Sequence, residues 1–271
     1  MALGDDSSGR AVYWIGPPPP AVLTWITRLL ELATFLLTAI WVVYYLGGVG
    51  LHPKQMMLGA NDTGRIFNWH PVLIALAFPV FMAEAVLAYR VPLVTSLDRP
   101  QRKIVHAALH SASLLCIVLA LIAAFQSHNL KRPTPTPNLY SPHSYLGLAV
   151  TILAFLQFFL GFGAYLYPTV AKRHREALGP LHTYLGKATF VAGLANMAVG
   201  IQEKTAFVVQ GKGLSGAALY KPVVSIPATI ELLLLLTGIA VLFHHQPPAA
   251  ARRHTVDTDN LLADVIDDPA A

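Results

Sequence analysis

The sequence has 271 residues, of which 55% are hydrophobic and only 12% are charged, with a formal net charge of +5. A soluble domain carries about twice that charged fraction, so the composition excludes a soluble enzyme, a disordered protein and a disulfide-rich scaffold. It indicates a polytopic protein of the lipid bilayer. The cations lie in short loops between apolar segments, which fits membrane topology better than nucleic-acid binding, so we expect no nucleic-acid partner.

Six apolar segments, taken in chain order, are each long enough to span a bilayer. They cover residues 21–46, 68–89, 104–125, 143–166, 182–201 and 224–243. We therefore predict an all-α membrane protein with six transmembrane helices, forming one domain over residues 21–245. A polar, proline-ended leader at 1–20 and a solvated tail at 246–271 flank this domain.

The distribution of lysine and arginine predicts the orientation. If the N-terminus is cytosolic, two short cytosolic loops hold many of the cations, among them Arg90, Lys103 and Arg175. Because positive charge favours the cytosolic side, we expect the leader and the tail, and hence both termini, in the cytosol. Plasma membrane and endomembrane both stay open. The first loop on the opposite side contains an N-x-T sequon at 61–63, which is a candidate glycosylation site.

Four consecutive apolar segments each carry a histidine near one end. His70 and His143 open the second and fourth segments from the non-cytosolic side, whereas His106 and His182 open the third and fifth from the cytosolic side. An ionisable side chain at membrane depth is a functional candidate, although a lone histidine is about equally well explained by a hydrogen bond between helices. The repetition favours function, because it pairs the histidines at two depths: His70 with His143, and His106 with His182.

Each pair can supply both axial ligands of a haem iron, since the porphyrin provides the remaining nitrogens. A zinc or copper site is disfavoured, because each level offers only two ligands with no nearby Cys or carboxylate. The pattern therefore predicts two haem sites, one toward each face of the membrane. His110 lies one turn from His106 on the same helix face and stays an alternative ligand; His106 is preferred because its depth is closer to that of His182.

Seven short motifs occur in order over residues 65–205. They are FNWHP at 67–71, AYR at 88–90, RKIVHAALH at 102–110, FQSHN at 125–129, NLYSPHSYLG at 138–147, GPLHTYLG at 179–186 and GIQEK at 200–204. Through these motifs the sequence resembles the cytochrome b561 family of ascorbate-reducible transmembrane oxidoreductases. The outer helices fit only by position and hydropathy, and Pro142 stands where the family usually has leucine.

The resemblance implies a six-helix protein, usually a homodimer, in which helices two to five form a central four-helix bundle enclosing two b-type haems. By motif, the ligands of the haem iron correspond to His70 and His143 on the non-cytosolic side and to His106 and His182 on the cytosolic side. The family passes an electron from cytosolic ascorbate to monodehydroascorbate or a ferric chelate across the membrane. We therefore expect a transmembrane ascorbate-dependent oxidoreductase, in which the electron tunnels past apolar side chains between the haems.

Two sets of candidate substrate residues follow. Ascorbate is an anion at neutral pH, so its cytosolic site needs cations near the His106–His182 level. The candidates are Lys103, Arg90, Arg99 and Arg175, and Lys103 ranks first. The alternative for the three arginines is that they only set the membrane orientation, as cations on the cytosolic side do. On the other side, the resemblance implies a substrate site bordered by His128, Asn129, Asn138 and Tyr140. His128 is also a candidate proton acceptor, with a plain surface histidine as the alternative.

Three other interpretations stay open. The first is a haem-free transporter or proton channel whose histidines relay protons; it is weakened because few other charges lie at depth, chiefly Glu84 and Lys187, with Glu31 and Glu231 nearer segment ends. The second is a haem b membrane subunit of a quinol-linked complex, which would need a partner subunit. The third is a structural membrane scaffold, which predicts a colourless protein.

Overall fold

The computed structural model describes residues 4–5, 11–12, 21–93, 96–166 and 170–245. Within this part, six segments are long and apolar enough to cross a bilayer: Ala21–Tyr45, Gly64–Leu87, Arg99–Asn129, Pro142–Leu166, Lys172–Gly211 and Pro222–Phe243. The prediction of six spanning helices is therefore confirmed, and the chain is a multi-pass integral membrane protein. The predicted tail 246–271 and most of the predicted leader 1–20 lie outside the described residues.

The six spans contain both regular and π-helical turns. The first is α1 (Ala21–Ile40) with π-helical η1 (Trp41–Tyr45), and the second is α2 (Gly64–Phe67), α3 (Trp69–Leu76), π-helical η3 (Ala77–Met82) and α4 (Ala83–Leu87). The others are α5 (Arg99–Asn129), α6 (Pro142–Gly161) with π-helical η4 (Phe162–Leu166), α7 (Lys172–Gly211) and α8 (Pro222–Phe243). The helices α5 and α7 extend beyond the predicted segments at both ends, because hydropathy marks only the part of a helix that matches the membrane.

Short elements complete the described part of the chain. Two antiparallel pairs of two-residue strands join β1 (Gly4–Asp5) to β2 (Ala11–Val12) and β3 (Lys54–Gln55) to β4 (Asn61–Asp62). Two 3₁₀ turns, η2 (Met57–Gly59) and η5 (Gly216–Tyr220), lie in loops. The strands are too short to form a sheet core, so the fold is held by helix packing.

Two helices that carry site histidines begin at capping boxes, which fix where each helix starts. At α5, the Asp98 carboxylate accepts from the Gln101 amide while the Gln101 side chain accepts from the Asp98 amide. At α6, Ser141 and Ser144 make the same reciprocal exchange. Pro142 takes the first position of α6, where its missing N–H costs no helical hydrogen bond.

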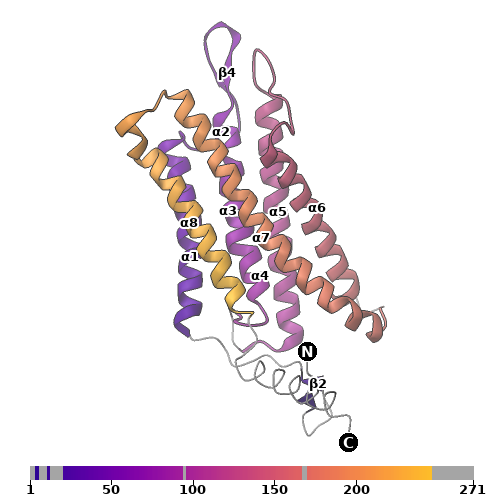
Figure 1. Ribbon diagram of the computed structural model, residues 1–271. Helices are drawn as coiled ribbons and strands as arrows, with labels where there is room; N and C mark the ends of the chain where they lie inside the picture. Colours follow the sequence, from indigo (N-terminus) through magenta and orange to yellow (C-terminus); the bar gives the residue numbers. More distant parts are fainter. Residues whose placement is uncertain (1–3, 6–10, 13–20, 94–95, 167–169, 246–271) are drawn as a thin grey trace, which may run out of the picture.

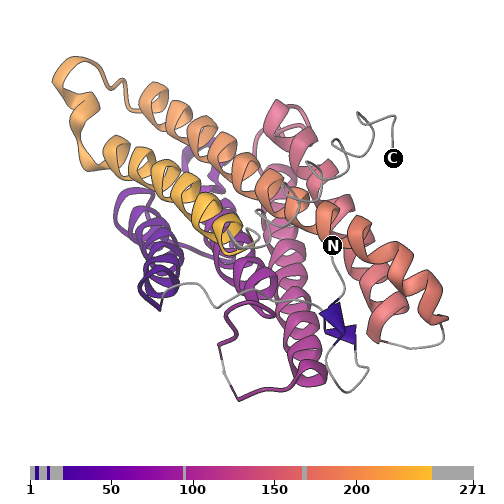
Figure 2. The same ribbon diagram turned by 60° about the horizontal axis from the view of Figure 1, so that its bottom comes forward.

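The second span, α5, α6 and α7 form a closed ring of contacting helices, which confirms the predicted central bundle. Within it, α3 packs on α5, α5 on α6, α6 on α7, and α7 on α3 and α4. The helices α1 and α8 pack on each other and cover the second span and α7 from outside. Both views show α1 and α8 on the opposite side of the molecule from α6 (Figures 1 and 2).

The bundle has two distinct ends. The helix α1 begins and α8 finishes at the same end (Figure 1). We call this the basic end, because Lys103 and Arg175 lie there near the starts of α5 and α7. The opposite end, which carries the β3–β4 hairpin, is called the hairpin end.

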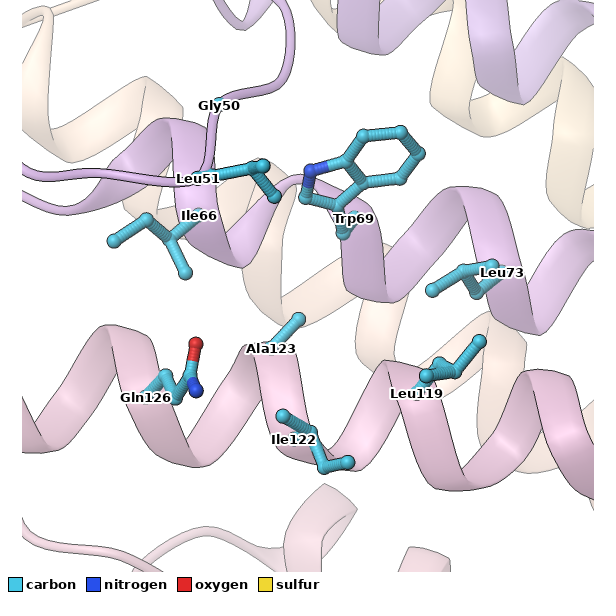
Figure 3. A pocket seen from close by; sticks show the side chains of 9 residues that line it. All are labelled: Gly50, Leu51, Ile66, Trp69, Leu73, Leu119, Ile122, Ala123 and Gln126. Carbon is cyan, nitrogen blue, oxygen red and sulfur yellow. The ribbon is translucent and has the colours of Figure 1, made fainter.

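A cavity of about 270 Å³ lies between the second span and α5 toward the hairpin end (Figure 3). Its lining comes from a loop, from α2 and α3, and from α5: Gly50, Leu51, Ile66, Trp69, Leu73, Leu119, Ile122, Ala123 and Gln126. None of the histidines or substrate residues predicted from the sequence is among them. The cavity is therefore separate from the predicted site residues.

Candidate functional site

The first histidine pair lies inside the bundle toward the hairpin end. His70 of α3 and His143 of α6 face each other with ring centroids 6.1 Å apart and ring planes nearly perpendicular, at 87°. The Nδ1 atom of His70 lies 3.1 Å from the carbonyl oxygen of Ala120 on α5, and that of His143 lies 3.1 Å from the carbonyl oxygen of Asn196 on α7. A carbonyl accepts only from a protonated nitrogen, so each ring keeps its unprotonated Nε2 for a partner.

The second pair lies toward the basic end. His106 of α5 and His182 of α7 have ring centroids 6.4 Å apart. The Nδ1 atom of His106 lies 2.7 Å from the carbonyl oxygen of Ala85 on α4, whereas that of His182 is buried without a hydrogen-bond partner. His110 lies beside His106, with centroids 4.5 Å apart. The ring that faces His182 and is held by a backbone carbonyl is that of His106, which favours His106 over His110 as a ligand.

Two glycines make room for the rings. A Cβ atom on Gly200 of α7 would lie 2.5 Å from the ring of His143, and one on Gly161 of α6 would lie 2.9 Å from the ring of His182. Real Cβ contacts are essentially never this short. Each of α6 and α7 therefore contributes one histidine and one glycine that seats the histidine of the other helix.

The spacing of both pairs fits an iron held between two imidazoles. Two metal–nitrogen bonds of about 2 Å, plus about 1 Å from each nitrogen to its ring centre, add up to a separation of about 6 Å. Among the described residues, no group of three or more His, Cys, Asp or Glu side chains could hold a metal ion. A closed zinc site needs four ligands from the protein. The donor set therefore fits two bis-histidine haems and not structural zinc.

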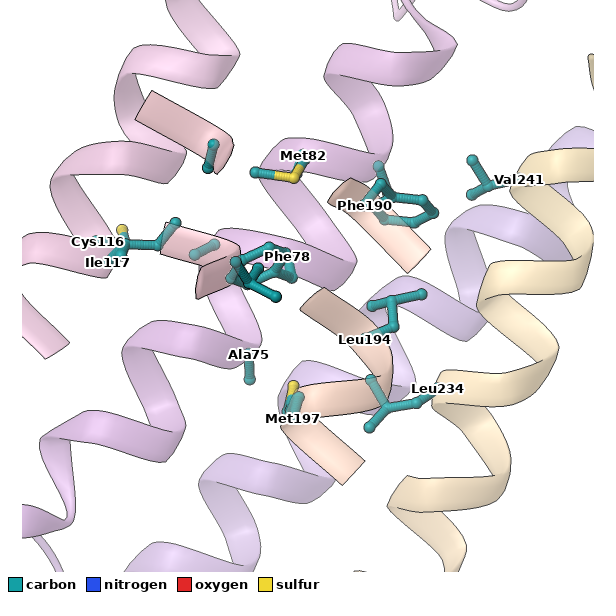
Figure 4. Packing of buried hydrophobic residues seen from close by; sticks show 14 of the residues in the cluster. Ala75, Phe78, Met82, Cys116, Ile117, Phe190, Leu194, Met197, Leu234 and Val241 are labelled. Carbon is teal, nitrogen blue, oxygen red and sulfur yellow. The ribbon is translucent and has the colours of Figure 1, made fainter. Parts of the chain in front are cut away.

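An apolar layer separates the two pairs. Along the sequence of the second span, Phe78 lies between His70 and Ala85, whose carbonyl accepts the hydrogen bond from His106. The ring of Phe78 packs on Gly193 of α7, where a Cβ atom would approach it to 2.0 Å. Figure 4 shows this ring among buried apolar side chains from several helices, including Phe190. The Ser113 hydroxyl donates to the Ala77 carbonyl at 2.9 Å. This hydrogen bond satisfies a backbone carbonyl of the π-helical segment η3, which contains Pro79.

At the basic end, Tyr165 connects two of the predicted cations. The Lys103 ammonium donates to the Tyr165 carbonyl at 3.0 Å, and the Tyr165 hydroxyl donates to the Arg175 carbonyl at 3.0 Å. The ring of Tyr165 also lies 5.5 Å from that of His182. The Lys103 ammonium and the backbone of Arg175 therefore both meet at Tyr165, beside the His106–His182 pair.

The other two predicted cations lie apart from Tyr165. Tyr89 lies 5.5 Å from His106 between ring centroids, and burial raises the pKa of the Tyr89 hydroxyl while nearby Arg99 opposes that rise. Arg99 is thus close to the histidine pair by way of Tyr89. Arg90 instead donates to the carbonyl of His244 at 2.8 Å, so it holds the end of α8 against the second span.

At the hairpin end, the four predicted polar residues form one connected group. The Nδ1 atom of His128 lies 3.2 Å from the Asn138 amide oxygen, and the Asn138 amide donates to the Asn129 side-chain oxygen at 2.8 Å. The ring of Tyr140 lies 6.0 Å from that of His128. The group is largely exposed, as a site for a water-soluble molecule has to be.

Two further residues join this group, and sequence reasoning did not single them out. The ring of Phe67 lies 5.6 Å from His70 and stacks on His128 at 6.4 Å, so it bridges the histidine pair and the exposed group. The Lys204 ammonium lies 4.7 Å from the centre of the Phe67 ring. Both residues lie within the seven motifs, but Lys204 follows the predicted apolar segment, so hydropathy does not indicate a place in a site.

The structure disfavours glycosylation at Asn61. This side chain is buried, its amide donates to the Leu130 carbonyl at 2.8 Å, and its oxygen accepts from the Arg132 amide at 2.9 Å. The asparagine therefore joins the β3–β4 hairpin to the loop after α5 and does not present its amide to solvent.

The comparisons with known proteins agree with this architecture. The family described as eukaryotic cytochrome b561 matches residues 69–208. A lysosomal membrane ascorbate-dependent ferrireductase of Mus musculus is 35% identical over 77% of this chain and 81% of its own length. A plasma membrane ascorbate-dependent reductase of Xenopus laevis is 34% identical over 79% of this chain and 71% of its own. A transmembrane ascorbate ferrireductase of Arabidopsis thaliana is 29% identical over 70% of this chain and 74% of its own.

Substituting Gly200→Ala tests the seat of His143. We expect the variant to lose one of two haems, because the added Cβ atom pushes the His143 ring away from His70. Haem per chain is measured in purified protein by the absorbance of its pyridine complex. Gly211→Ala, on the same helix with open space at its Cβ position, is the matched control and should keep both. Equal haem content in the two variants would contradict the assignment.

Proposed function

The chain belongs to the cytochrome b561 family, and from this premise we propose that it is an oxidoreductase that moves electrons across a membrane from cytosolic ascorbate to an acceptor on the other side. The relatives described as ascorbate-dependent reductases support the donor, and those described as ferrireductases support a ferric chelate as acceptor. Monodehydroascorbate is the second candidate acceptor. The observation that carries the proposal is the pair of facing histidines at each end of the bundle.

We propose that His70 and His143 hold one b-type haem and that His106 and His182 hold the other. Such a haem, when bound, supplies one-electron transfer without an open iron position for oxygen. The backbone carbonyls of Ala120, Ala85 and Asn196 support this role, because they fix which nitrogen of each ring is free to bind a metal. Gly161 and Gly200 let the rings seat closely between helices.

The basic end would bind ascorbate from the cytosol. Lys103 contacts Tyr165 through its ammonium and Arg175 through its backbone carbonyl, with Tyr165 beside His182. The charges of these two residues would hold the ascorbate anion at this end. Arg99 adds charge near Tyr89. Arg90 is the weakest candidate, because it is engaged with the end of α8.

The hairpin end would bind the acceptor. His128, Asn129 and Asn138 present imidazole and amide groups on one surface, and Tyr140 borders them. These groups can donate to the oxygens of monodehydroascorbate or of a chelator. Phe67 places an aromatic ring between this surface and His70, and Phe78 places another in the apolar layer. Homodimer formation and the identity of the membrane stay predictions.

Substituting His143→Ala tests the proposed function. In vesicles loaded with ascorbate, the wild-type protein should reduce an external ferric chelate, whereas the variant should lose one haem and nearly all transmembrane transfer. His110→Ala should keep both haems and most of the transfer. Retention of both haems by His143→Ala would show that the ligand assignment is wrong. Transfer by a protein that holds no haem would refute the role proposed for the haems, and a haem-loaded wild-type protein that transfers no electrons would refute the function.

Substituting Lys103→Ala tests the ascorbate site. Loss of one charge-assisted contact should raise the KM for ascorbate by about tenfold, which corresponds to about 1.4 kcal/mol. The kcat with saturating ascorbate should change little. Lys172→Ala is the control, because Lys172 lies at the same end but pairs with Glu176 on the exposed surface. An unchanged KM in Lys103→Ala would remove this lysine from the site.

A further inference from the structure

One lysine at the hairpin end has a position that the proposed haem ligands and substrate residues do not explain. Lys204 of α7 is half-buried, and its ammonium lies 4.7 Å from the centre of the Phe67 ring. Within the described part of the chain, the Lys204 side chain makes no hydrogen bond and no ion pair. A contact with an aromatic ring stabilises an ammonium but does not neutralise its charge. The charge of Lys204 is therefore available to a bound anion.

Two other cations of the hairpin end are held by backbone carbonyls. Arg65 donates to the Val49 carbonyl at 2.8 Å, and Lys131 donates to the Asn61 carbonyl at 2.7 Å. Each of these side chains joins one segment of the chain to another, so a structural role accounts for it. The Lys204 ammonium makes no such bond to a backbone group of the described residues, and packing alone gives no reason for a charged group there.

The carboxylates near Lys204 do not pair with it. The two ion pairs in the described part of the chain both lie toward the basic end. Asp62 acts on Lys204 electrostatically, but its side chain is exposed and accepts from the Gly64 amide at 2.8 Å, and solvent weakens such an interaction. Glu203 precedes Lys204, and successive residues of an α-helix project about 100° apart. The two side chains therefore leave α7 in different directions.

The ring of Phe67 places Lys204 on the proposed route of the electron. The same ring lies 5.6 Å from the ring of His70 and stacks on that of His128 at 6.4 Å, with an angle of 6° between the planes. His70 is a proposed haem ligand, and His128 belongs to the exposed polar group that we propose binds the acceptor. The Lys204 ammonium therefore lies beside the aromatic ring that contacts both.

A cation in this position favours an acceptor of negative charge. Its attraction draws an anion from solution to the surface. When the acceptor gains one electron, its negative charge grows by one, so the attraction becomes stronger during the transfer. In a ferric chelate, Fe(III) becomes Fe(II), and no bond is made or broken at the acceptor. The electron comes from the ascorbate monoanion, which releases one proton to the cytosol as it becomes its radical anion.

We propose that Lys204 is a specificity-determining residue of the hairpin end, which selects electron acceptors of negative charge. This inference rests on the proposed function and adds one residue and a charge preference to its acceptor surface. Monodehydroascorbate and the ferric chelates of polycarboxylates are anions, so both candidate acceptors satisfy the preference. A cationic one-electron acceptor does not.

The test compares two acceptors of opposite charge, added outside vesicles that contain the protein and are loaded with ascorbate. Ferricyanide is an anion and tris(phenanthroline)cobalt(III) is a cation, and each takes up one electron without exchange of its ligands. We expect Lys204→Gln to raise the KM for ferricyanide about fivefold, as loss of one solvent-screened charge contact does. The same variant should lower the KM for the cobalt complex, and Lys204→Arg should keep both wild-type values. Lys212→Gln removes an exposed charge about two turns further along the chain and should change neither KM.

The two acceptors separate charge selection from other roles of the lysine. If Lys204 only packs on Phe67, Lys204→Gln moves both KM values in one direction or leaves both unchanged, and either result overturns the proposal. If Lys204 instead holds a carboxylate of the bound haem, the variant shifts a haem midpoint potential while the ratio of the two KM values stays as in the wild type. That result also overturns it.

A measurement on the wild type needs no variant to fold. Added salt screens charges, so it should raise the KM for ferricyanide and lower that for the cobalt complex. Transfer to both acceptors with KM values that salt does not change would overturn the selection by Lys204 and leave the proposed function intact. A haem-loaded wild-type protein that reduces neither acceptor would refute the proposed function itself.

Discussion

The arrangement of the bundle depends on hydrogen bonds from histidine rings to backbone carbonyls of neighbouring helices. His70, His106 and His143 each direct Nδ1 to a carbonyl on a different helix from their own. Each bond fixes the position of the ring and leaves its Nε2 unprotonated and able to bind a metal. Such a bond forms only when two helices have the correct depth and rotation relative to one another. The helix packing, including the close approach at Gly161 and Gly200, is therefore what makes two facing pairs from four separate spans.

The two ends of the bundle offer different chemistry. The basic end presents lysine and arginine around Tyr165, whereas the hairpin end presents an imidazole and amides around Phe67. Between them, Phe78 and its apolar neighbours fill the bundle. A layer of this kind resists the passage of ions, because a charge in an apolar medium is strongly disfavoured. In the proposed function only electrons cross it.

Much of the fold and part of the site could be predicted from the sequence, because hydropathy and the placement of histidines along a helix are local properties. The choice between His106 and His110 was not local: it depends on the carbonyl of Ala85 and on which ring faces His182. Lys204 was missed because α7 continues past the apolar stretch. Glu31 lies near the end of a predicted segment, and its burial follows from the packing of α1 on the second span and on α8.

Electron transfer from ascorbate to two haems is tested most directly by the absorption spectrum of the purified chain in detergent, before and after addition of ascorbate, with haem per chain quantified. We expect two b-type haems per chain, largely reduced by ascorbate. A folded, haem-free protein would contradict this expectation and would favour a transport role for the histidines. Haem that is reduced by dithionite but not by ascorbate would contradict the proposed donor and favour a quinol-linked membrane subunit.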